Sequence, residues 1–177
     1  MPNIDTLRES VHAQTTLMVR EMADAIKFDC RGMIEAGEQL TTPEMVGSPV
    51  MPAIPLAPST IRRKEKIGAI SPSTPRLRFG ELEESIMSGS LGEDSAFVAI
   101  EGDELVAHFQ QFGTSRMPAR PFFGVSAEAK AECDAIQART QERINVEFHG
   151  MDLPPTNINV NVGIGSESAW NETWPHS

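Results

Sequence analysis

The sequence predicts an α+β fold in which a small antiparallel β-sheet packs against two long helices. Two proline-free stretches carry apolar residues three or four positions apart, which is the period of an amphipathic helix. Between them, the short apolar run at residues 96–100 is typical of a strand. A proline-rich loop and an extended C-terminal arm complete the predicted architecture.

The composition is that of an ordinary globular chain. Its 177 residues suit one domain, with 40% hydrophobic and 23% charged residues, and the net charge of −10 argues against general nucleic-acid binding. No apolar run approaches the ~20 residues that span a bilayer, and the start, MPNIDTLRES, lacks the order of a secretory signal. We therefore expect no membrane association and a reducing compartment, in which Cys30 and Cys133 are buried and unpaired.

The first predicted unit, residues 1–38, is one long helix from residue 4 to about 38. Its apolar stripe consists of Leu7, Val11, Met18, Met22, Ala25, Ile26, Cys30, Met33 and Ile34. A helix of this length extends about 50 Å at ~1.5 Å per residue. Since that exceeds what a domain of this size covers, we expect part of the stripe to pack on another chain.

The second unit, residues 39–57, is a proline-rich crossing. Prolines recur through TTPEMVGSPVMPAIPLAPS, which excludes a helix and a central strand. A semi-rigid arm and a surface loop are both compatible with this composition.

The third unit, residues 58–150, is the predicted α+β core. It begins with a short basic helix from Pro58 that Gly68 closes, followed by a short helix in LRFGELEESIM with Leu77, Leu82 and Ile86 on one face. Residues 96–100 and 105–109 are then predicted to pair as a β-hairpin. A final helix is predicted from an N-cap at Ser126 to Gly150, and its stripe consists of Ala129, Cys133, Ile136, Thr140 and Ile144.

Basic residues are concentrated at the start of this core. Glu65 is the one acidic residue among six basic ones, which are Arg62, Arg63, Lys64, Lys66, Arg76 and Arg78. In an otherwise acidic chain, such a segment can face DNA or an acidic partner. A solvated basic loop is the equally weighted alternative.

The last unit, residues 151–177, is predicted to be an extended arm. Its apolar residues Ile158, Val160, Val162 and Ile164 alternate with Asn and Gly, which is a strand pattern without a local partner. The arm either closes the sheet of its own chain or pairs with a neighbouring subunit.

The sequence lacks the usual signatures of catalysis. The histidines are scattered, His108 among them, and no phosphate-binding loop, GxSxG or HExxH motif occurs. Glu81, Glu83 and Glu84 are the acidic face of a predicted helix. We therefore expect a protein that is not an enzyme, with no catalytic residues, cofactor, metal or small-molecule substrate.

The segment FGTSRMPARPFFG is stiff and apolar. Pro118 and Pro121 fix two backbone angles and remove two amide donors. The aromatic side chains of Phe112, Phe122 and Phe123 can anchor it, and the guanidinium groups of Arg116 and Arg120 suit fixed carboxylates. Such a segment fits a contact surface between subunits, and it equally fits an internal crossover.

Four pieces of the chain, in order, resemble the tail-completion or neck proteins of tailed bacteriophages. They are PLAPSTIRRKEKIG (residues 55–68), LRFGELEESI (77–86), AHFQQFGTSRMPARPFFGVS (107–126) and the helix beyond. The likeness is to the phage virion morphogenesis family and to related minor tail proteins, and it covers roughly residues 55–148. The order of the pieces and the string PARPF are its specific features. The Asp-Thr-Gly usual before the short helix is Arg78-Phe79-Gly80 here.

The resemblance implies a structural virion protein that forms a ring at the head–tail junction after assembly in the bacterial host cytoplasm. A hexamer is favoured, with twelve copies as the alternative, and the partners are connector, tail-terminator or tail-tube proteins. The predicted contact residues are Phe112, Arg116, Arg120, Phe122, Phe123, Ile158, Val160 and Val162. The basic segment then faces an acidic partner or DNA passing through the channel.

Two other hypotheses compete with this one. The first is a small DNA-binding or regulatory protein that uses the basic helix at residues 61–66. The second is a hydrolase that combines His108 with the acidic residues at 81–84.

Overall fold

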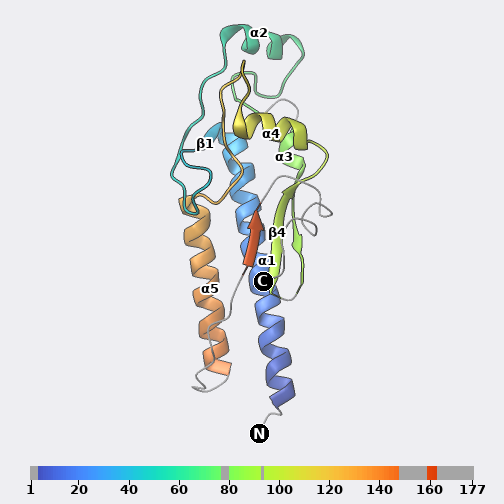
Figure 1. Ribbon diagram of the computed structural model, residues 1–177, viewed down its shortest axis with the longest axis vertical. Helices are drawn as coiled ribbons and strands as arrows, with labels where there is room; N and C mark the ends of the chain where they lie inside the picture. Colours follow the sequence, from blue (N-terminus) through green and yellow to red (C-terminus); the bar gives the residue numbers. More distant parts are fainter. Residues whose placement is uncertain (1–3, 77–79, 93, 148–158, 163–177) are drawn as a thin grey trace.

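The structure is a computed structural model that describes residues 4–76, 80–92, 94–147 and 159–162. Figure 1 shows an elongated molecule in which two long helices run side by side and a small sheet lies along one of them. In chain order the elements are α1 (Ile4–Ala36), β1 (Glu38–Leu40), β2 (Val50–Pro52), α2 (Pro58–Lys66), α3 (Glu81–Glu84), β3 (Ile86–Ser90), β4 (Ser95–Ile100), α4 (Glu104–Phe112), α5 (Ala127–Glu147) and β5 (Asn159–Val162).

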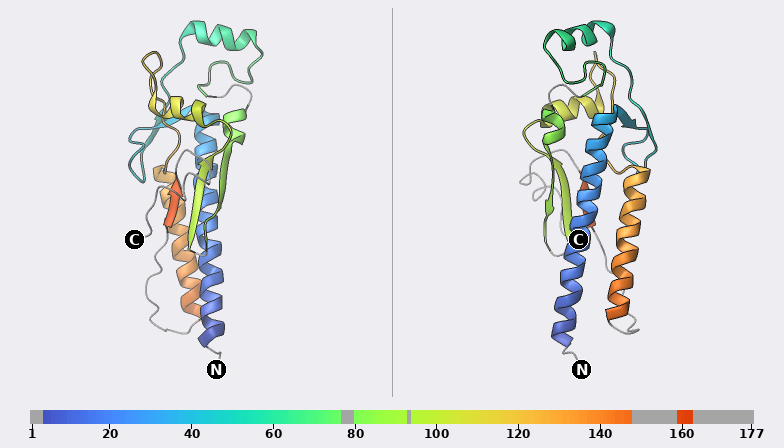
Figure 2. Two further views of the ribbon diagram at one scale, coloured as in Figure 1. Left: turned by 45° about the vertical axis from the view of Figure 1, so that its right-hand side comes forward. Right: turned by 180° about the vertical axis from the view of Figure 1, so that it is seen from behind.

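Helix α1 is the central element of the fold. Its buried positions are Thr15, Met18, Val19, Ala23, Ile26, Cys30, Met33 and Ile34. They pack against α5 on one side and against β3 and β4 on the other (Figure 2). From Thr15 onward the stripe is mostly buried within this chain, because α5, β3 and β4 pack against it. The expectation that part of the stripe packs on another chain stays a prediction.

Helix α5 runs antiparallel to α1 and is fixed at both ends. At its start, the Ser126 Oγ accepts a hydrogen bond from the Ala129 amide at 3.0 Å, which confirms the predicted N-cap. At its end, the Glu147 carboxylate accepts hydrogen bonds from Ser10 (2.8 Å) and Gln14 of α1. The predicted stripe of α5 is also confirmed, since all five of its residues are buried.

The main sheet has the order β3-β4-β5. Strands β3 and β4 pair antiparallel, from Ile86 opposite Ile100 to Ser90 opposite Ala96. Strand β5 adds to β4 in parallel, with Ser95 opposite Asn159 and Val98 opposite Val162. The sheet packs on α1, whereas α5 lies against α1 rather than across the sheet (Figure 2).

The predicted hairpin at 96–100 and 105–109 was half wrong. The first strand is confirmed as β4, but residues 105–109 lie in α4. The apolar residues Leu105, Phe109 and Phe112 stand four and three positions apart, which is the period of a helix. This spacing was overlooked in favour of a strand. The antiparallel partner of β4 is β3 (Ile86–Ser90), whose Ser and Gly residues are not typical of a strand. The short helix predicted in LRFGELEESIM therefore ends at Glu84, before this strand begins.

The proline-rich crossing contains a two-stranded antiparallel pair. Strand β1 pairs with β2, from Glu38 opposite Pro52 to Leu40 opposite Val50. Both are edge strands, so Pro52 deprives no central ladder of a donor. The chain then rises to α2 at one end of the molecule (Figure 1), where the predicted basic helix is confirmed and Gly68 follows it with φ +70°.

Candidate assembly surface

The crossover, residues 113–125, leads from α4 to α5, and its second half packs inside the molecule, where residues 120–124 are buried. Gln111 clamps it: the side-chain Oε1 accepts from the amides of Phe122 and Phe123 at 3.1 Å each. Its Nε2 donates to the Phe123 carbonyl at 2.9 Å. Phe122 is fully buried and Phe123 nearly so. Phe122 and Phe123 therefore belong to an internal crossover, which is one of the two interpretations that the sequence allowed for this segment.

Two buried arginines bind backbone carbonyls around the crossover. Arg120 donates from Nε to Ile54 O at 2.7 Å and from Nη2 to Pro55 O at 3.2 Å. Arg76 donates to three carbonyls, those of Arg120 (2.9 Å), Met33 (3.0 Å) and Glu38. Among the described residues, no carboxylate forms an ion pair with either guanidinium. Both side chains therefore tie loops to the core.

Burial shapes the electrostatics of this pair. The pKa of Arg76 is lowered to about 10, mainly by burial and secondly by the nearby charge of Arg120. Burial likewise lowers the pKa of Arg120. Both groups remain cations at neutral pH, so the carbonyl dipoles must compensate two charges in the interior.

These positions correct the predicted contact surface. Arg120, Phe122 and Phe123 are buried and cannot meet a partner in this conformation, and Arg76 cannot face DNA. Phe112 and Arg116 are exposed, as a contact role requires. Arg76 and Arg120 were misassigned because their side chains turn inward to carbonyl groups far away in the sequence. The sequence alone does not show these acceptors.

The remaining predicted residues divide into three groups. Arg62, Arg63 and Lys66 are exposed on α2, whereas Lys64 is half-buried and its Nζ donates to the carbonyls of Ser71 (3.1 Å) and Thr74 (2.6 Å). The backbone of Val160 and Val162 belongs to β5, which pairs with β4 of the same chain. Arg78 and Ile158 lie outside the described residues.

Helix α4 presents apolar side chains to solvent. The exposed residues, here called the apolar edge, are Leu105 (67%), Val106 (47%), Phe109 (41%) and Phe112 (62%). The opposite side of α4 is buried through Ala107 and Gln111. The proline-rich segment adds further exposed apolar residues, which are Met45, Val46, Val50, Met51 and Ile54. A row of exposed apolar side chains along one edge of a helix is typical of a protein–protein contact.

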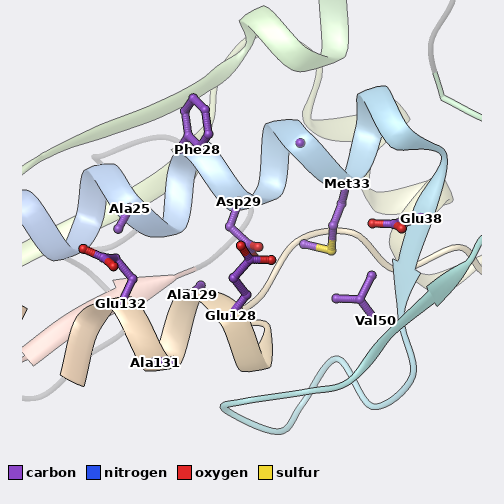
Figure 3. Close-up of a pocket in the computed structure, with 11 residues that line it drawn as sticks. Ala25, Phe28, Asp29, Met33, Glu38, Val50, Glu128, Ala129, Ala131 and Glu132 are labelled. Carbon is purple, nitrogen blue, oxygen red and sulfur yellow. The ribbon is translucent and has the colours of Figure 1, made fainter. Parts of the chain in front are cut away.

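A groove with a volume of about 690 Å³ lies between α1 and α5. Figure 3 shows Asp29 of α1 and Glu128 of α5 pointing toward each other across it, with Met33 and Val50 at one end. Glu38 and Glu132 also line it, and its lining includes no Lys or Arg. The apolar Phe28 is 79% exposed at its rim.

Charge repulsion acts inside this groove. Burial raises the pKa of Asp29, hydrogen bonding from Ser126 opposes that rise, and repulsion from Glu128 and Glu38 adds to it. The Ser126 Oγ donates to Asp29 Oδ1 at 2.9 Å, while Asp29 Oδ2 has no hydrogen-bond donor among the described residues. The groove is therefore a negative site that would favour a cation.

The described residues offer little for catalysis. No group of three or more His, Cys, Asp or Glu side chains within them is placed to hold a metal ion. Cys30 and Cys133 are free and buried as predicted, and burial raises the pKa of their thiols to about 12 and about 11. His108 lies on exposed α4, with its ring centroid 4.8 Å from that of Phe112. Within the described ranges, no helix has the length and apolar character to span a bilayer.

Sequence reasoning missed the apolar edge, the Gln111 clamp and the groove. The spacing of Leu105, Phe109 and Phe112 carried the signal for the first. The other two depend on which elements pack together. Comparison of the chain with family models, curated proteins and solved structures found no match.

Proposed function

We propose that this protein is a structural, self-assembling component of a bacteriophage virion that joins the connector to the tail tube. The observation that carries the proposal is the apolar edge of α4, whose residues Phe109 and Phe112 lie within the segment that resembles the neck and tail-completion proteins. An exposed row of Leu, Val and Phe side chains is costly in a lone subunit and is useful in an assembly.

The role of the crossover supports the same proposal. In the string PARPFFG, Arg120 and Phe122 hold α4, α5 and the proline-rich segment in fixed relation. Residues that stabilise the fold in this way keep the exposed surfaces of the protein in a fixed arrangement, which suits a protein that acts by binding other subunits. The apolar edge and Arg116 then remain on the outside as the candidate contact residues.

A ring of six copies is the favoured assembly, and a ring of twelve is the alternative. Copies related by rotation bury the same two surfaces at every contact, so a closed ring leaves neither of those surfaces exposed. Connector, tail-terminator or tail-tube proteins would bind the two faces of the ring.

Particle analysis tests this proposal. The gene is inactivated in the phage that encodes the chain, and lysates are inspected by electron microscopy and by mass spectrometry of purified particles. We expect the chain in intact virions, and in its absence we expect filled heads and tails that fail to join. Infectious, complete particles without the chain would overturn the proposal.

A further inference from the structure

We propose that α2 of one copy docks in the groove between α1 and α5 of a second copy, so that the basic helix fills the acidic site of its neighbour. This inference rests on the proposed self-assembly and names the two surfaces that make the contact. It assigns a role to α2 and to the groove, which are both separate from the apolar edge of α4.

The groove lacks a counter-charge of its own. Asp29, Glu38 and Glu128 repel one another there, and one oxygen of Asp29 is buried without a donor. Among the described residues, Glu132 is the one lining carboxylate that forms an ion pair, with Arg139 at 3.2 Å on the exposed surface of α5. Carboxylates that lack a counter-ion repel one another, so an incoming guanidinium that pairs with Glu128 or Glu38 would stabilise the site.

Helix α2 is the matching element. It contains no buried residue, and it lies at one end of the molecule beyond α4 (Figure 1). Within the described part of the chain, Arg62, Arg63 and Lys66 form no ion pair. The helix also has Ile67 exposed beside it, so it offers both charge and apolar surface to a partner.

The two surfaces agree in size and shape. At ~1.5 Å per residue, α2 is about 13 Å long, and the lining residues of α1 from Ala25 to Met33 extend over the same length of about 13 Å. Four of the lining residues are small, which are Ala25, Gly32, Ala129 and Ala131. A Cβ atom built on Gly32 would meet nothing within 4 Å, so the groove is open there. Small residues allow a second helix to approach closely.

The positions of the two surfaces imply a head-to-tail contact. In both views of Figure 2, α2 stands at one end of the molecule, and α1 and α5, whose residues line the groove, extend away from it. A contact between different surfaces of identical chains repeats from copy to copy, and it closes into a ring when the rotation permits.

Cross-linking between two tagged variants tests the contact directly. One full-length variant carries Ala131→Cys in the groove, and the other carries Arg62→Cys on α2. After mixing and oxidation we expect a disulfide-linked pair with one copy of each tag. The matched control is Gln137→Cys, exposed on the flank of α5 away from the groove, which should give at least tenfold less product. Equal linkage of Arg62→Cys to Ala131→Cys and to Gln137→Cys, or linkage of Ala131→Cys to another segment of its own chain, would overturn the inference.

Charge reversal with rescue provides the second test, measured by sedimentation of the full chain. Arg62→Glu with Arg63→Glu, or Glu128→Lys with Glu132→Lys, should each weaken self-association on the order of tenfold or more. A chain with all four changes, or a mixture of the two variants, should recover it. Gly32→Met should also block the contact while leaving the fold intact, because its side chain would occupy open groove.

Three results would overturn the inference. They are a wild-type chain that stays monomeric at about 0.5 mM, reversed charges that leave association unchanged, and salt-dependent binding of duplex DNA by α2 without self-association. Failure of the proposed function is a separate result, since particles assembled without this chain leave the docking of purified copies intact.

Discussion

The guanidinium of Arg76 lies over the ring of Phe122, with its Cζ 5.3 Å from the ring centroid. The same side chain donates to the carbonyls of Met33 and Arg120 and so connects α1 to the crossover. Arg76 also has φ +68°, a left-handed backbone conformation that strains any residue with a Cβ atom. The hydrogen bonds and the ring contact of the Arg76 side chain thus offset the cost of its buried charge and of its strained backbone.

Replacing Arg76 should destabilise the fold strongly. Arg76→Met leaves buried carbonyls without donors, and we expect the free energy of unfolding in urea to fall by about 3 kcal/mol. Arg76→Gly should be less harmful than Arg76→Ala by about 1 kcal/mol, because glycine relieves the backbone strain. Arg63→Met on exposed α2 is the control and should change stability by less than about 0.5 kcal/mol. Equal effects at the two positions would contradict the structural role of Arg76.

Gly113 should tolerate no side chain. Its φ is +73°, and a Cβ atom would lie 2.7 Å from the Ala119 nitrogen and 2.8 Å from the Met117 oxygen. Since both neighbours are backbone atoms, the turn must open, and we expect Gly113→Ala to cost about 2 to 4 kcal/mol in urea unfolding. Gly92→Ala is the control, because nothing lies within 4 Å of its Cβ position. A Gly113→Ala protein as stable as wild type would mean that this turn has another conformation.

Asp29 should make the protein less stable as pH rises through its titration. Its pKa in the folded state is raised above the ordinary value of 3.8, so the folded state binds the proton more tightly than the unfolded chain. The resulting loss of stability begins near pH 3.8 and is complete above the folded-state pKa. We expect Asp29→Asn to be at least as stable as wild type at pH 7 and to lack this part of the pH profile.

The measurement is urea unfolding at low protein concentration from pH 4 to pH 7. Glu142→Gln, on the exposed surface of α5, serves as the control for removal of a negative charge. If Asp29→Asn destabilised the protein at pH 7 more than at pH 4, the sign of the argument would be wrong.

Both cysteines should resist alkylation in the folded protein. Cys30 is fully buried and Cys133 is 6% exposed, and burial holds the pKa of both thiols far above neutrality. We expect iodoacetamide at pH 8 to label them at least about 100-fold more slowly than in urea, as followed by mass spectrometry. Rapid labelling of Cys133 alone would indicate that α5 separates readily from α1.

The apolar edge should matter for assembly and hardly for folding. Leu105→Glu with Phe112→Glu changes two side chains that are 67% and 62% exposed, so unfolding free energy should change by less than about 1 kcal/mol. Assembly with tail components, or rescue of a null phage, should be lost. The control is Gln137→Glu with Ala138→Glu on exposed α5. Normal rescue by the α4 variant would remove the apolar edge from the contact surface.

The two long helices, the N-cap at Ser126 and the buried stripe of α5 could be predicted from the sequence, because helix periodicity and capping are local properties of the chain. The pairing of β4 with β3, the inward orientation of Arg76 and Arg120, and the acidic groove between α1 and α5 could not be predicted in this way. Each of these depends on groups that lie far apart in the chain, such as the 43 residues between Arg76 and its acceptor on Met33. A strand can pair with its partner, and a buried charge can reach its hydrogen-bond acceptor, only after the helices have packed together.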